Sequence, residues 1–229
     1  MSSTSPHGRD STPVASDGRG SYERRFQPLQ VSLWIGVAVA PLLVGVRRVW
    51  AFTIDDAGIV YAYARSLAEG SGFKAAVGGP VVAGFSDFLW VLLLVPLHWL
   101  GADLQIASKI LGVGLGAAGV VLTTRLVDQT RTDRTTHPSW EALTAALILG
   151  LCVEFVVWLP SGMENGLFFA ALAALLSLDG LEARAPHRVL VSWVPAAAVC
   201  LSRPEGILYA AVIGAGEPCH KTSQSSTLG

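Results

Sequence analysis

Charged residues are scarce in this sequence, and lysine is scarcer still. Only 14% of the 229 residues are Asp, Glu, Lys or Arg, and the net charge is −1. Lysine is found only at Lys74, Lys109 and Lys221. Nucleic-acid-binding domains carry clustered basic residues that meet the phosphates, and this chain has no such excess. We therefore expect no nucleic-acid partner.

The sequence is also poor in the residues that build disulfides and soft-metal sites. Its three cysteines, Cys152, Cys200 and Cys219, form no Cys-x-x-Cys pair, and the first two lie within apolar runs. The five histidines show no ligand spacing. We therefore interpret the cysteines as small buried side chains and expect no His/Cys metal site.

Apolar residues, by contrast, are abundant. The chain is 52% hydrophobic and its mean hydropathy is +0.51, values typical of a polytopic membrane protein. Between residues 28 and 216 about five or six apolar segments are separated by polar breaks. They lie at 29–46, 106–126, 142–159, 166–181, 189–201 and 207–216. The sequence thus predicts an all-α membrane domain over 28–216.

The two ends of the chain are polar. Residues 1–27 are rich in Ser, Thr, Gly, Pro and charge, which predicts a disordered tail, and the arginines before residue 29 place that tail in the cytoplasm. Residues 217–229 are polar and follow directly on half a span. We expect this last segment to be the end of a truncated chain.

The short apolar run 88–100 decides the topology. As a helix it would be about 20 Å long, against a bilayer core of roughly 30 Å. If it does not cross, most arginines of the polar linkers lie on the cytoplasmic side, as the positive-inside rule favours. We therefore predict that 88–100 is a juxtamembrane helix. Asp55, Glu164 and Arg203 then all face outward.

The stretch Phe-Thr-Ile-Asp-Asp-Ala-Gly at 52–58 follows the first apolar segment. Thr53 and Asp56 match a capping box, which predicts a helix over 57–69 closed by the two glycines after it. Arg65 and Glu69 can pair on one face of that helix. Adjacent carboxylates repel, so the pKa of one of them can be raised, as a general base requires. Alternatively, one caps the helix and the other is solvated.

Four ordered motifs resemble those of GT-C glycosyltransferases, most closely the arabinofuranosyltransferases and mannosyltransferases of mycobacterial-type cell envelopes. The first is Phe52-Thr-Ile-Asp-Asp-Ala, with Tyr61-x-Tyr63-Ala-Arg65 and Leu67-Ala-Glu-Gly70 after it. The second is Gly84-Phe-Ser-Asp-Phe-Leu-Trp90, similar to Gly-Tyr-Thr-Ser-x-Leu-Trp. The others are Gly162-Met-Glu-Asn and Arg203-Pro-Glu-Gly206. The resemblance covers roughly residues 45–215.

The resemblance implies a GT-C-like helical bundle in the bacterial plasma membrane, whose first extracytoplasmic loop carries juxtamembrane helices. It implies transfer of a pentose or hexose from a polyprenyl-phosphate donor to a cell-envelope glycan or glycoconjugate. Asp55 or Asp56 is then the general base, or the pair holds a divalent cation such as Mg²⁺ or Mn²⁺. Arg203, and more weakly Arg65 and Lys74, would contact the donor phosphate.

The same resemblance assigns binding or support of the acceptor to four residues, Glu164, Glu205, Tyr61 and Trp90. Several of the predicted site residues also have a simpler interpretation. Glu164 can be a solvated loop acid, the aromatic side chains can belong to the interfacial belt, and Arg203 can extend toward lipid headgroups. Two other functions stay open. One is an inactive remnant or membrane interaction protein, and the other, less favoured, is a transporter.

Overall fold

The computed structural model describes residues 28–76, 79–82, 84–129, 140–179 and 186–221, and over these ranges the chain is helical without a strand. The all-α prediction is therefore confirmed for this part of the chain. The helices are α1 Pro28–Arg48, α2 Asp55–Ala68, α3 Phe88–Trp99, α4 Leu104–Gln129, α5 Trp140–Leu151, α6 Val153–Trp158, η1 Leu159–Ser161, α7 Asn165–Asp179, α8 Pro186–Ser202 and α9 Gly206–Lys221.

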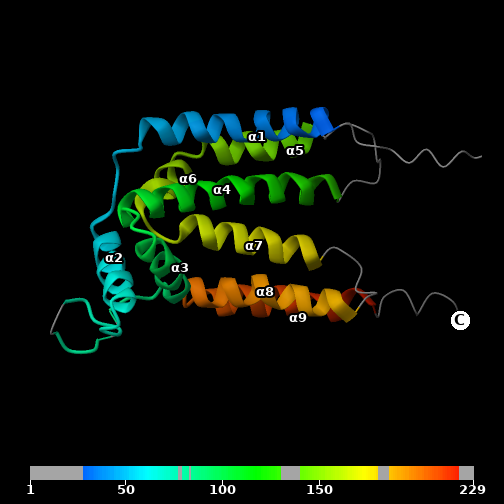
Figure 1. The fold of residues 1–229 in the computed structure, drawn as a ribbon. Coiled ribbons are helices and arrows are strands. Elements are labelled where there is room, and N and C mark those ends of the chain that lie inside the picture. The colour runs from blue at the N-terminus through cyan, green and yellow to red at the C-terminus, as the bar shows by residue number, and fades with distance from the viewer. Residues whose placement is uncertain (1–27, 77–78, 83, 130–139, 180–185, 222–229) are drawn as a thin grey trace, which may run out of the picture.

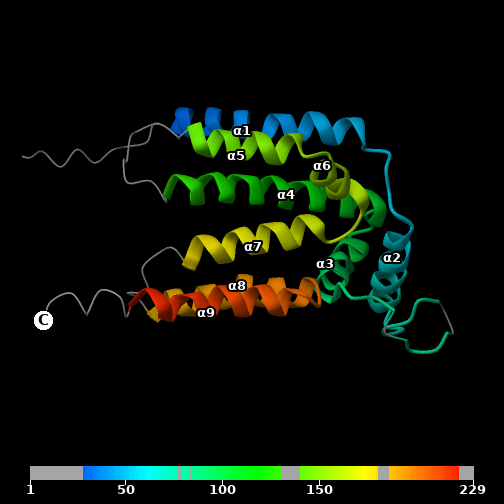
Figure 2. The same ribbon diagram turned by 180° about the vertical axis from the view of Figure 1, so that it is seen from behind.

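Most of the helices run along one common axis (Figure 1). Helices α1, α4, α5, α7, α8 and α9 form this bundle, and α4 lies between α5 and α7. Helices α2 and α3 gather with α6 at one end of the bundle, which we call the α2–α3 end. The view from behind shows the same grouping (Figure 2). The polar breaks before α2, before α7 and before α9 all fall at this end.

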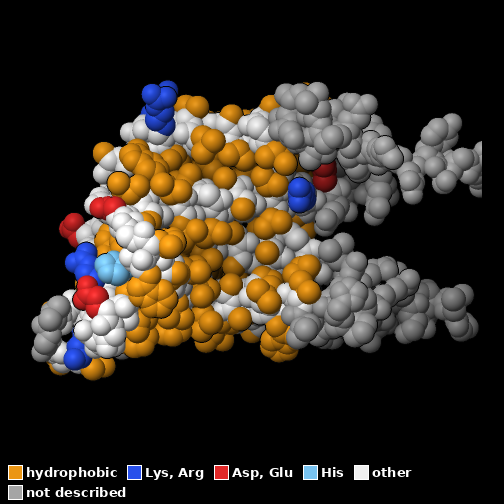
Figure 3. Space-filling view, in the orientation of Figure 1, with side chains coloured by type: hydrophobic (Ala, Val, Ile, Leu, Met, Phe, Trp, Pro, Cys, Tyr) orange, Lys and Arg blue, Asp and Glu red, His pale blue; other side chains and the backbone are white. Residues whose placement is uncertain are grey.

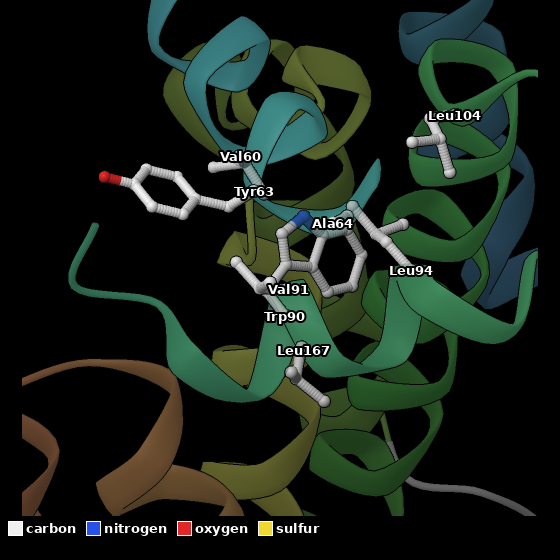
Figure 4. Close-up of a cluster of buried hydrophobic side chains, with 8 residues drawn as sticks. All are labelled: Val60, Tyr63, Ala64, Trp90, Val91, Leu94, Leu104 and Leu167. Atoms are coloured by element: carbon white, nitrogen blue, oxygen red, sulfur yellow. The ribbon is translucent and has the colours of Figure 1, made fainter. Parts of the chain in front are cut away.

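A buried cluster joins α2 and α3 to the bundle (Figure 4). Its members are Val60, Tyr63 and Ala64 from α2, Trp90, Val91 and Leu94 from α3, Leu104 from α4 and Leu167 from α7. Trp90 is completely buried there. Burial of large apolar side chains contributes about 1.5–3 kcal/mol each. The cluster therefore holds α3 firmly across the end of α4 and α7.

The apolar run 142–159 does not form one straight helix, because the chain breaks at Cys152. Cys152 has an extended backbone (φ −67°, ψ 108°), and α5 and the segment after it are bent by 61°. Val156 of α6 is buried against Gly45 of α1, where a Cβ would lie 2.8 Å from a Val156 methyl. The contact between α6 and α1 therefore holds α6 at an angle to α5, whereas the continuous apolar run alone would suggest one axis for both.

The capping box predicted for α2 is also wrong. The helix begins at Asp55, its N-cap is Ile54, and no side chain caps it. The Thr53 hydroxyl instead accepts a hydrogen bond of 3.1 Å from Gln105 Nε2 of α4. The predicted end of the helix is confirmed, since Gly70 has a φ of 75°, a left-handed conformation that glycine adopts freely.

The predicted pair between Arg65 and Glu69 does not form. Glu69 Oε1 instead lies 3.9 Å from His98 Nε2 of α3. The two side chains are partly exposed, so this contact contributes little to stability. In an isolated α2 the Glu69 side chain could pair with Arg65. Once α3 packs beside α2, His98 becomes an alternative partner for Glu69.

One helix in the described part of the chain, Leu104–Asp128 within α4, is long and apolar enough to cross a membrane. The bent pair Trp140–Leu151 and Val153–Ser161 would add a second if it forms one span. Further apolar helices are shorter: α3, Asn165–Leu178, Val191–Ser202 and Gly206–Ala215. Helix α3 lies across one end of the bundle, while its place relative to a membrane and the number of membrane crossings stay predictions.

Candidate functional site

Three hydrogen bonds gather separate parts of the chain around the turn between η1 and α7. The backbone N–H of Ile54, just before α2, donates to Ser161 O at 3.2 Å. Trp90 Nε1 of α3 donates to Gly162 O at 3.0 Å. Arg203 Nε donates to Glu164 Oε1 at 2.7 Å. The segment 161–164 therefore positions α2, α3 and the turn between α8 and α9 relative to one another.

Glycine at position 162 permits this close approach. Its φ is 95°, and a Cβ there would collide with the Tyr61 hydroxyl and lie 2.9 Å from Ala57 Cβ. Any side chain would therefore push α2 away from the turn. The Tyr61 hydroxyl is itself held 2.7 Å from Ser108 Oγ of α4, and burial raises the pKa of Tyr61. Tyr61 thus positions α2 against α4.

The centre of the site is an ionic group of Glu164, Arg203 and Glu205. Arg203 Nη1 lies 3.3 Å from Glu205 Oε1, so two carboxylates contact the guanidinium. Glu164 is only 3% exposed, whereas the Arg203 side chain is 37% exposed and its Cζ lies 5.6 Å from the Phe168 ring centroid. A buried carboxylate therefore holds an arginine that still opens to the outside. Glu164 is not the solvated loop acid of the simpler interpretation.

Asp87 is a further buried acid whose charge interacts with those of Glu164 and Arg203, and the prediction from sequence did not include it. It precedes α3, is 1% exposed, and its side chain makes no capping hydrogen bond. Burial raises the pKa of Asp87 from 3.8 to about 6, the charge of Glu164 adds to the rise, and Arg203 opposes it. An acid directly before the apolar run 88–100 was the available signal.

Asp55 and Asp56 lie in the first turn of α2, and both are exposed. Carboxylates in this position are stabilised by the helix dipole. The segment before them is tied down by buried Lys109 of α4, whose Nζ donates to Trp50 O and Phe52 O, both at 2.7 Å. The Ile54–Ser161 hydrogen bond brings this turn of α2 to the same end as Glu164.

The other predicted site residues fall outside the ionic group. Arg65 is exposed along α2, Lys74 lies in the loop after it, and neither makes an ion pair within the described residues. Trp90 is buried, so it offers no ring face to a sugar and instead holds the site together. No group of three His, Cys, Asp or Glu side chains in the described ranges could enclose a metal ion, which leaves Asp55 and Asp56 without a third such ligand.

The arrangement can bind an anion at the exposed edge of Arg203 and can take up a proton at a nearby carboxylate. Comparison with protein-family models, with curated proteins and with solved structures finds no match.

Proposed function

We propose that the protein is a membrane glycosyltransferase of the GT-C type, which moves a pentose or hexose from a polyprenyl-phosphate donor to a cell-envelope glycan or glycoconjugate. The observation that carries the proposal is the Arg203–Glu164 pair at one end of an apolar bundle. A donor of this kind joins a phosphate to a lipid. It therefore needs a cation next to an apolar surface.

The surface of the bundle supports a membrane setting. Most charged side chains visible in Figure 3 lie toward the α2–α3 end or close to the opposite end, and the flank between them is largely hydrophobic. Exposed apolar side chains come from all six helices of the bundle, and they include Val44, Ile110, Ile148, Val194 and Val212. So large an apolar surface is unusual for a soluble monomer and suits contact with lipid. We place the bundle in the bacterial plasma membrane, with the α2–α3 end outside.

The proposed chemistry is direct displacement at the anomeric carbon. Asp55 or Asp56 removes the proton of the acceptor hydroxyl, and both carboxylates are exposed and so available to an acceptor. Arg203 binds the phosphate that leaves with the lipid, because a guanidinium offers parallel donors to two phosphate oxygens. The buried Glu164 carboxylate accepts a hydrogen bond from Arg203 Nε, so the arginine is already fixed in place before the donor binds.

The test is sugar transfer in membranes that contain the protein, with a radiolabelled polyprenyl-phosphate sugar as donor. Loss of a general base lowers a rate by about 10² to 10⁴. We therefore expect Asp55→Asn or Asp56→Asn to reduce transfer by at least about a hundredfold, and Arg203→Met to weaken donor binding.

Glu154→Gln is the matched control, because Glu154 is an exposed acid of α6 outside the proposed machinery. It should transfer sugar at the wild-type rate. Wild-type turnover in both aspartate variants would remove the proposed base. Absence of transfer by the wild-type protein from every polyprenyl-phosphate sugar offered would overturn the proposal as a whole.

A further inference from the structure

We propose that Asp87 is a positioning residue that couples phosphate binding at Arg203 to the uptake of one proton. The inference rests on the proposed function, because it takes Arg203 as the contact for the donor phosphate. It goes further by giving the site a proton requirement and by assigning that requirement to one side chain. Asp87 acts through Arg203 and Glu164 and does not itself touch the reacting atoms.

The first argument is that two buried carboxyl groups lack a donor. Asp87 Oδ2 and Glu164 Oε2 are both shielded from solvent and accept no hydrogen bond. A carboxylate can only accept, whereas a protonated carboxyl group has an O–H to donate. A buried polar atom without a partner costs about 1–3 kcal/mol. One proton on Asp87 turns one of these acceptors into a donor and removes one of the two buried charges.

The second argument is the balance of charge around the guanidinium. When Asp87 is ionised, Arg203 is the single cation acting on it, and the buried acids Asp87 and Glu164 together with the half-exposed Glu205 outnumber that cation. A phosphate would add another negative charge beside them. When Asp87 is neutral, the excess of negative charge around Arg203 falls from two to one, and half-exposed Glu205 carries the remaining one, so an incoming phosphate meets less repulsion.

Three titratable groups on or beside α3 have partners of their own, while Asp55, Asp56 and Arg65 of α2 are exposed. On α2 the Tyr63 hydroxyl donates to Val82 O at 2.7 Å, and on α4 the Lys109 ammonium donates to the Trp50 and Phe52 carbonyls. On α3 itself His98 lies near Glu69. Since the pKa of Asp87 is about 6, its proton is taken up within the physiological range.

The experiment measures binding of a phosphodiester, the methyl ester of farnesyl phosphate, to the purified protein in detergent micelles between pH 5 and pH 8. A phosphodiester keeps one negative charge over this range, so the ligand itself does not titrate. Apparent affinity follows the fraction of protein that is competent to bind. With a pKa of about 6, that fraction rises about fivefold from pH 7 to pH 6.

We therefore expect the wild-type dissociation constant to fall about fivefold over that pH unit. Calorimetry in buffers of different ionisation enthalpy should show net proton uptake on binding at pH 7. Asp87→Asn is neutral at every pH, so its affinity should be flat across the range and about tenfold tighter than wild type at pH 7. Asp87→Ser provides a second neutral variant should the asparagine variant fold poorly, and it should behave in the same way.

Three results would overturn the proposal. They are an affinity that does not rise as the pH falls, a neutral variant that keeps the wild-type pH profile, and a pH dependence that disappears on removing divalent cations with EDTA. A failure of the proposed function would look different. It would appear as no sugar transfer, or as no binding of the phosphodiester at any pH by the wild-type protein or by the neutral variants.

Discussion

Asp87 and Trp90, one helical turn apart, show how burial rather than residue type assigns roles in this site. Trp90 has the ring of a sugar-binding residue, yet it is buried and its Nε1 donates to Gly162 O. Asp87 has the carboxylate of a helix cap, yet it makes no capping hydrogen bond, and its charge interacts with those of Glu164 and Arg203. The hydrogen bond of Trp90 fixes α3, and with it Asp87, to the turn that leads to Glu164.

The raised pKa of Asp87 predicts a stability change with a defined sign. The unfolded pKa is about 3.8 and the folded pKa about 6, so the folded state binds more protons between these values. The free energy of unfolding therefore falls as the pH rises from about 4 to 6 and stays low above that range. The difference in pKa corresponds to about 2–3 kcal/mol.

Asp87→Asn removes that ionisation, so we expect it to stabilise the protein by about 2 kcal/mol at pH 8. The measurement is the unfolding midpoint in detergent micelles at pH 8 and at pH 4.5. At pH 4.5 Asp87 is mostly protonated in the folded protein, and the gain should largely disappear. Asp103→Asn, at the exposed start of α4, is the control and should show no such gain. An asparagine variant less stable than wild type at pH 8 would contradict the assignment.

At the scale of the elements, glycines let α4 approach its neighbours. A Cβ at Gly166 of α7 would collide with the carbonyl of Gly112 of α4, and one at Gly119 would collide with the Phe169 ring. Gly116 similarly faces the Leu159 side chain. Small residues at such crossings let two helix backbones come close. The position of α7, and through it that of Glu164, depends on them.

We therefore predict opposite effects for two glycine-to-alanine substitutions. Gly166→Ala places a methyl group against backbone that cannot move aside, and it should destabilise the protein by about 2–4 kcal/mol and separate α4 from α7. Gly114→Ala on α4 meets nothing within 4 Å, so it should be neutral or add up to about 1 kcal/mol through helix propensity. Thermal unfolding of both variants in micelles decides the matter. Equal midpoints would show that the crossing tolerates expansion.

At the scale of the whole molecule, helix direction sets where the polar groups gather. Helix α4 runs away from the α2–α3 end, α5 returns to it, α7 leaves it again, and α8 returns (Figure 1). The turns before α7 and before α9 consequently lie at the same end as α2. Helix α3 lies across that end and does not run the length of the bundle, so α4 begins at the same end. The helices after α3 therefore alternate in direction as the predicted topology requires.

The proposed orientation in the membrane predicts which positions a membrane-impermeant maleimide reaches in intact cells. In a protein whose cysteines are replaced, Asp56→Cys should be labelled from outside and Arg125→Cys only after the membrane is opened. Both positions are exposed, and they lie at opposite ends of the bundle. Labelling of position 125 but not 56 in intact cells would reverse the orientation, and the proposed extracytoplasmic site with it.

The sequence by itself determined the helical class, the positions of the main helices and the polar breaks between them. Apolar runs and glycines determine where a helix forms and ends through residues that are close in sequence, so these features can be predicted from short stretches of the chain. The sequence also predicted that the breaks at Glu164 and Arg203 lie at one end, because alternating helices bring every second break there, but the contact between the two side chains came from the tertiary structure. The residues before 28 and after 221, and the linkers 130–139 and 180–185, lie outside the described residues, so the predictions for them stay predictions.

Only the tertiary structure decided the bend at Cys152, the partner of Thr53 and the place of Asp87. Each depends on a neighbour far away in the sequence: Gly45 for the bend, Gln105 for Thr53, and Glu164 with Arg203 for Asp87. Whether a carboxyl group is solvated or buried changes its pKa and its role, and burial is a property of the packed helices together. The physical reason is that desolvation and close contact arise only once the helices meet.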